Sequence, residues 1–209
     1  MINALLILFM ISLLYLSIIT RMRTFIQIIS FQGLLLFGLF FLGLTEISAT
    51  NLTIILLETL IFKAIAVPAF IDYVIDRNKI TREVEPYLPN FISLINVTAI
   101  ILIIFLMSTF INDTSLKKSY FIVALSALFI GLYILLTRRK VITHFIGYLV
   151  IENGVSVLTL AVGSEMPLFV NLGIMLDIFV SVLILGIFIN KIGDVLKDVD
   201  INQLRNIKD

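Results

Sequence analysis

The sequence predicts an all-α integral membrane protein with about seven transmembrane helices. Of its 209 residues, 60% are hydrophobic and only 14% are charged, a balance far from that of a water-soluble domain. The apolar residues gather into segments of roughly 20 residues, the length of helix that crosses the hydrocarbon core of a bilayer. Basic residues recur in alternate connections between these segments, as expected for a multi-pass protein.

The apolar segments define the predicted helices. The first segment is long enough to span a bilayer, and its positive charges, Arg21 and Arg23, follow it instead of preceding it. We therefore expect a retained transmembrane helix and not a cleaved signal peptide. The fifth segment is the shortest. The seven segments lie at 2–20, 25–44, 51–75, 90–111, 120–136, 141–162 and 168–190.

Basic residues orient the predicted helices. They lie in the connections after the first, third and fifth segments and in the C-terminal tail, whereas the connections around Glu46 and Glu165 contain no Lys or Arg. Lys117 and Lys118 are an exception. The balance places the N-terminus outside and the C-terminus in the cytoplasm. The residues concerned are Arg21, Arg23, Arg77, Lys79, Arg82, Arg138, Arg139, Lys140, Lys191, Lys197, Arg205 and Lys208.

The longest connection, 76–90, divides the chain into two halves. It has mixed charge and two prolines, which is typical of a linker on the cytoplasmic side. The stretch TRMRTF before the second helix resembles TRRKVITHF before the sixth. We therefore expect two parallel three-helix units, at 1–76 and 119–209, joined by the linker and one crossing helix at 77–118.

The composition also excludes several kinds of site. There is no cysteine, so the chain can form no disulfide, thiolate metal site or cysteine nucleophile. A single histidine cannot build a histidine-based metal cluster, and no glycine-rich phosphate loop is present. We expect no cofactor in this chain.

The third predicted helix contains two ionisable residues, Glu58 and Lys63, followed by Pro68. Lys63 lies too deep for its side chain to reach either membrane surface comfortably. A spacing of five residues puts Glu58 and Lys63 on different faces of a regular α-helix. Pro68 cannot donate to the carbonyl of Ala64, so we expect a kinked or loosened turn that could admit water to a proton path. The alternative is a structural Lys–Glu pair, although buried pairs stabilise poorly compared with apolar packing.

The sixth predicted helix carries a polar stripe. His144, Tyr148, Glu152 and Ser156 follow one another at intervals of four residues and therefore share one helical face. A carboxyl group at membrane depth is costly and usually serves proton or ion movement. The stripe predicts a hydrogen-bonded relay for protons. His144 would be the point of proton entry, because imidazole changes charge near neutral pH. The alternative is a protonated Glu152 that holds neighbouring helices together.

The seventh predicted helix places Asp177 at mid-depth, with Ser181 one turn further and Asn171 nearer the outer end. The cost of an intramembrane carboxyl again favours a functional role. Three other polar residues are better explained as helix-interface or end-of-helix residues: Gln27, Gln32 and Asp72.

These features resemble hydrogenase-4 component E, a membrane subunit of group 4 nickel–iron hydrogenases and formate hydrogenlyase complexes. The resemblance covers nearly the whole chain. It rests on RRKVITHFIGYLVIENGVSVLTL, on LGIMLDIFVSVLILGIFINKI, on the tail DVDINQLRNIKD and on FKAIAVP in the third helix.

The last three predicted helices also resemble subunit K of respiratory complex I and the corresponding small subunit of multisubunit sodium/proton antiporters of the Mrp type. Subunit K carries two membrane glutamates that are linked to proton transfer. Asp177 falls where the third-helix glutamate of that family lies. Leu149 occupies the position of the second-helix glutamate, and Glu152 follows three residues later, on nearly the same face but about one turn away.

The resemblance implies a non-redox subunit in the membrane arm of a hydrogenase complex in a prokaryotic cell membrane. The nickel–iron and iron–sulfur centres would belong to partner subunits, and antiporter-like membrane subunits would lie alongside this chain. Glu152, Asp177, Lys63 and Glu58 would form part of a lateral chain of ionisable groups whose charge changes move protons or sodium ions. His144 would be a further proton-transfer residue, and Tyr148, Ser156 and Ser181 would be supporting polar residues.

Two further functions remain open at the level of the sequence. The chain could be a subunit of a stand-alone cation/proton antiporter, although the related small subunit of such antiporters resembles only the last three helices. It could also be a structural spacer whose buried charges serve packing. An independent secondary carrier is disfavoured because no paired broken helices mark a substrate site.

Overall fold

A computed structural model describes residues 1–43, 52–53, 55–77, 87–111, 116–138, 141–162 and 186. Within these ranges the regular structure is helical, without β-strands. The helices are α1 (Ile2–Ile18), α2 (Met22–Gly43), the π-helix η1 (Leu56–Ala66) continuing into α4 (Val67–Arg77), α5 (Asn90–Thr109), α6 (Lys118–Thr137) and α7 (Val141–Val162).

The fold is that of an all-α, multi-pass membrane protein. Four of the described helices, α2, α5, α6 and α7, are long and apolar enough to cross a membrane, and α1 is a shorter apolar helix. Each predicted segment between residues 2 and 162 contains a helix in its described part, with the third divided between η1 and α4. The predicted seventh helix, 168–190, lies outside the described residues except for Gly186, which lies against Phe70 of α4.

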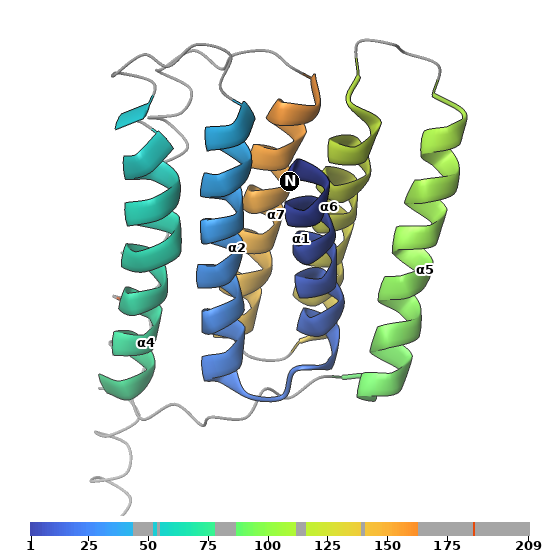
Figure 1. The fold of residues 1–209 in the computed structure, drawn as a ribbon. Helices are drawn as coiled ribbons and strands as arrows, with labels where there is room; N and C mark the ends of the chain where they lie inside the picture. The colour runs from blue at the N-terminus through green and yellow to red at the C-terminus, as the bar shows by residue number, and fades with distance from the viewer. Residues whose placement is uncertain are drawn as a thin grey trace, which may run out of the picture.

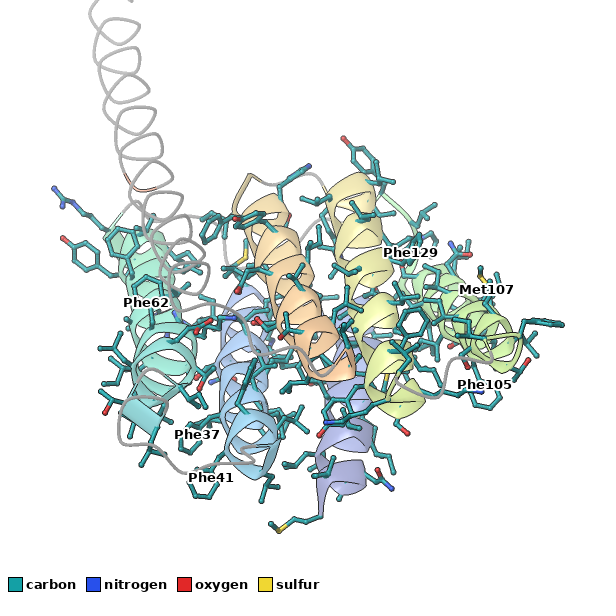
Figure 2. All side chains as sticks on the ribbon, turned by 90° about the horizontal axis from the view of Figure 1, so that it is seen from above. Phe37, Phe41, Phe62, Phe105, Met107 and Phe129 are labelled. Carbon is teal, nitrogen blue, oxygen red and sulfur yellow. The ribbon has the colours of Figure 1, made fainter. Side chains whose placement is uncertain are left out.

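Successive helices run in opposite directions across the bundle (Figure 1). From one edge to the other the order is α4, α2, then α1 and α7 on opposite sides, then α6 and α5 (Figures 1 and 2). Arg23 at the start of α2 bonds Asp76 at the end of α4, whereas the Lys117 amide before α6 donates to the carbonyl oxygen of Ala161 near the end of α7. The arginines at helix ends, Arg21, Arg23, Arg77 and Arg138, share one end of the bundle, and Lys117 and Lys118 lie at the opposite end.

Close helix packing holds the bundle together, because apolar burial gives little drive between helices that lipid also solvates. The most extensive contact joins α6 and α7. There a methyl group on Gly154 would lie only 3.0 Å from the Ala127 side chain and from the Leu128 amide nitrogen. The outer surface remains apolar: Phe105 and Met107 point away from the bundle on α5 (Figure 2).

The π-helix η1 precedes Pro68. At its end the amide of Val67 donates to the carbonyl oxygen of Phe62, five residues back, which is the π-helical spacing. Pro68 has no amide hydrogen for the carbonyl of Ala64. The hydroxyl of Ser30 on α2 donates to that carbonyl oxygen at 2.5 Å. The loosened backbone predicted near Pro68 thus takes the form of a π-helix on its N-terminal side.

Candidate functional site: a buried charge cluster between η1 and α7

The site is centred on a salt bridge between two helices. The ammonium nitrogen of Lys63 on η1 lies 2.5 Å from a carboxylate oxygen of Glu152 on α7. Both side chains are more than nine-tenths buried. At membrane depth each charge would be costly alone, and pairing removes much of that cost. The two residues that the sequence placed in one chain of ionisable groups are therefore direct neighbours.

Two further side chains complete the cluster. Lys63 donates to the hydroxyl oxygen of Ser156 at 2.6 Å. The Ser156 hydroxyl lies 3.1 Å from the backbone carbonyl oxygen of Glu152, to which it donates. On the other side, a carboxylate oxygen of Glu58 lies 3.9 Å from the Lys63 nitrogen. We name Lys63, Glu152, Ser156 and Glu58 the Lys63 cluster.

The position of Glu58 corrects one sequence-based expectation. A spacing of five residues separates two side chains on a regular α-helix, so Glu58 and Lys63 were expected on different faces. That expectation is wrong, because η1 is a π-helix: its turns are wider than those of an α-helix, with hydrogen bonds to the residue five back, and they bring Glu58 and Lys63 toward the same face. The apolar pattern of the segment carries no signal for this change, since it depends on hydrogen bonds around Pro68.

The charge balance of the Lys63 cluster defines what it can do chemically. One ammonium group faces two carboxyl groups, so a neutral cluster requires one carboxyl to hold a proton. Lys63 contacts both carboxyl groups, so either of them can balance its charge. The arrangement can therefore store one proton inside the bundle.

A second buried polar chain begins at the next residue of α7. The amide nitrogen of Asn153 donates to the side-chain oxygen of Gln32 on α2 at 3.2 Å. The amide nitrogen of Gln32 donates to the hydroxyl of Ser12 on α1 at 2.9 Å, and Ser12 donates to the carbonyl oxygen of Phe9. We name Ser12, Gln32 and Asn153 the amide chain. Gln32 was expected at a helix interface and does lie at one, whereas Ser12 and Asn153 were missed.

Some of the remaining predicted site residues lie on described helices, and the others fall outside the described residues. Tyr148 and His144 precede Glu152 on α7 by one and two turns. Asp72 lies 3.7 Å from Arg23 at the basic end of the bundle. The other predicted residues, Asp177, Ser181 and Asn171, fall outside the described part of the chain.

No protein-family model matches the chain, and no solved structure matches it. Over 86 residues the chain is 27% identical to the uncharacterized protein Rv0085 of Mycobacterium tuberculosis. That similarity covers 41% of this chain and 39% of the relative, so the matched region is about two fifths of either protein.

Proposed function

We propose that this chain is a non-redox membrane-arm subunit of an energy-converting hydrogenase complex. In this proposal the Lys63 cluster helps to couple hydrogen-evolving or hydrogen-oxidising electron transfer in partner subunits to translocation of protons or sodium ions. The nickel–iron and iron–sulfur centres belong to those partners, and antiporter-like subunits adjoin this chain in a prokaryotic cell membrane. The chain has seven spans in two parallel three-helix units, with its N-terminus outside and its C-terminus in the cytoplasm.

The buried Lys63–Glu152 pair is the observation that carries the proposal. Apolar side chains would hold η1 against α7 at less cost than two buried charges, so a purely structural role explains the pair poorly. Glu58 provides a second carboxyl group near the Lys63 ammonium, so the negative charge that balances Lys63 can reside on Glu152 or on Glu58. In the proposal Asp177 is a further member of the lateral chain, and His144 and Tyr148 extend the chain toward the basic end of α7. The proposal that the partner subunits carry redox centres rests on the resemblance to hydrogenase-4 component E.

Replacing Glu152→Gln in the assembled complex tests the proposal. Glutamine keeps the shape of the side chain but cannot carry the charge or exchange the proton. We expect ion translocation per electron pair to fall by about tenfold or more, because a positioned proton-transfer group is lost. Hydrogen-linked electron transfer to an artificial acceptor should remain largely intact. Proton and sodium uptake by native membrane vesicles would be measured together with hydrogen turnover.

Asp76→Asn is the matched control, since it makes the same chemical change in a half-exposed carboxylate at the basic end. It should leave translocation unchanged. Full translocation by Glu152→Gln in an assembled complex contradicts the proposed role. Loss of assembly in that variant, with normal pumping in the complexes that do form, favours the structural spacer.

The identity of the complex has its own test. A tagged chain purified from its native membrane in mild detergent should bring nickel–iron hydrogenase and iron–sulfur subunits with it, as identified by mass spectrometry. Recovery of antiporter subunits alone would overturn the hydrogenase assignment and favour a stand-alone cation/proton antiporter.

A further inference from the structure

Three consecutive residues of α7 contact three different helices. Glu152 reaches Lys63 on η1, Asn153 reaches Gln32 on α2, and Gly154 packs against Ala127 on α6. Successive residues of an α-helix point about 100° apart, so these contacts spread around the whole helix. Figure 2 shows α7 between α2 and α6. The rotation of α7 about its axis is therefore fixed by three neighbours at one level.

The contacts also close a triangle between η1, α2 and α7. Neighbouring residues on α2 contact the two other helices: Gln32 bonds Asn153, and Gly33 lies against Ala64. On η1, Ala64 directly follows Lys63, which bonds Glu152. Each helix thus uses two adjacent residues to contact the other two. A rotation of any one helix must disturb both of its contacts.

The orientation of the two amide groups follows from Ser12. A hydroxyl has one hydrogen, and Ser12 donates it to the carbonyl oxygen of Phe9 at 2.6 Å. Ser12 must then accept from the amide nitrogen of Gln32, which turns the Gln32 oxygen toward Asn153. Asn153 meets that oxygen with its own amide nitrogen. Within the amide chain each hydrogen bond has a fixed donor and acceptor, and no group in the chain is charged or ionises near neutral pH.

We propose that Gln32 and Asn153 are positioning residues for the Lys63–Glu152 pair. Their amide–amide bond sets the rotation of α7, and Glu152, one residue earlier, is thereby held against Lys63. This role deepens the proposed function, which uses the same pair. The amide chain itself transfers no proton, so the ionisable path does not continue through it toward α1.

An exchange of the two amides tests this role. Gln32→Asn shortens the contact by one methylene, and Asn153→Gln lengthens it, so each alone breaks the fit. The double variant restores the summed length. The measurement is the rate at which a membrane-permeant amine-reactive reagent acylates Lys63 in native membranes, followed by peptide mass spectrometry. Exposed Lys117 serves as the internal standard.

We expect each single variant, and Asn153→Leu, to raise the Lys63 acylation rate about tenfold, the factor for a coupling of about 1.4 kcal/mol. The double variant should return to within about twofold of the native rate. Asn96→Leu is the matched control, because it removes an interhelical amide contact to Tyr133 that touches neither α2 nor α7. It should leave Lys63 unchanged.

Two results would overturn the positioning role. One is native Lys63 reactivity in every single variant. The other is a Lys63 acylation rate in the double variant, or in the Asn96→Leu control, that is as high as in the single variants. That pattern would indicate general loosening of the bundle. The readout is chemical and needs no ion translocation. The positioning role can therefore fail while Glu152→Gln still abolishes pumping, and it can hold if pumping proves independent of Glu152.

Discussion

At the scale of single residues, Lys63 depends on its partners. The ammonium group is buried inside the bundle, and it is matched by Glu152 at 2.5 Å and by Ser156 at 2.6 Å. Removing one member of a buried pair leaves the other charge uncompensated, which costs more than removing both. The same residue thus contributes to stability and to the proposed charge movement.

Substitution of the pair should therefore be strongly non-additive. We expect Lys63→Met and Glu152→Leu each to destabilise the protein by about 3–5 kcal/mol, and the double variant to be more stable than either. Unfolding in mild detergent, followed by circular dichroism, measures this cycle. Additive losses would show that Lys63 and Glu152 do not stabilise one another.

Arg138 shows the same dependence at the basic end of the bundle. Its buried guanidinium donates to the carbonyl oxygens of Leu16 and Ser17 and lies over the ring of Phe25. Those carbonyls belong to the last turn of α1, where no helical amide is left to bond them. From the sequence Arg138 is one of several basic loop residues, and the residues beside it, Thr137 and Arg139, give no sign that it caps another helix.

At the scale of helices, the sequence predicts what depends on composition and misses what depends on neighbours. The long apolar runs place α1, α2, α5, α6 and α7 to within a few residues. The π-helical register of η1 is set by hydrogen bonds around Pro68 and Ser30, which no apolar pattern encodes. Among the site residues, Lys63 and Glu152 can be recognised from the sequence because charged residues are rare in such apolar segments. Asn153 can be recognised only from its hydrogen bond to Gln32 on another helix, which the sequence does not reveal.

The contact of α2 with η1 leads to a prediction at this scale. A methyl group on Gly33 would lie 2.7 Å from the backbone nitrogen of Ala64, an approach that real side chains do not make. Gly33→Ala should therefore push η1 from α2 and destabilise the protein by about 1–3 kcal/mol. It should also raise the acylation of Lys63, the residue before Ala64.

Gly43→Ala is the control for that variant. It lies on the same helix, but its nearest neighbour, a methyl carbon of Leu160, would be at an ordinary 3.6 Å. Unfolding in detergent should separate the two variants clearly. Equal stability of Gly33→Ala and Gly43→Ala would mean that η1 can move away from α2 without cost.

At the scale of the whole molecule, the alternating direction of the helices decides which connections share a side. The C-terminal ends of α1, α4 and α6 lie together, and the starts of α1, η1 and α6 lie toward the opposite end (Figure 1). Arg23 and Asp76 tie α2 to α4 at one end, and the amide of Tyr87 donates to the carbonyl oxygen of Thr137 there. Because Arg21, Arg23, Arg77 and Arg138 collect at this end, the positive-inside rule predicts that it faces the cytoplasm.

Single cysteines test both the pairing of ends and the orientation. The chain contains no cysteine, so each introduced thiol is the only one to react. A membrane-impermeant thiol reagent added to intact cells should label Phe110→Cys and Lys117→Cys but leave Thr20→Cys and Tyr87→Cys unlabelled until the membrane is opened. Labelling of only the second pair would reverse the orientation and keep the fold. Labelling of one residue from each end would contradict the helix directions themselves, and with them the basic end on which the cytoplasmic assignment depends.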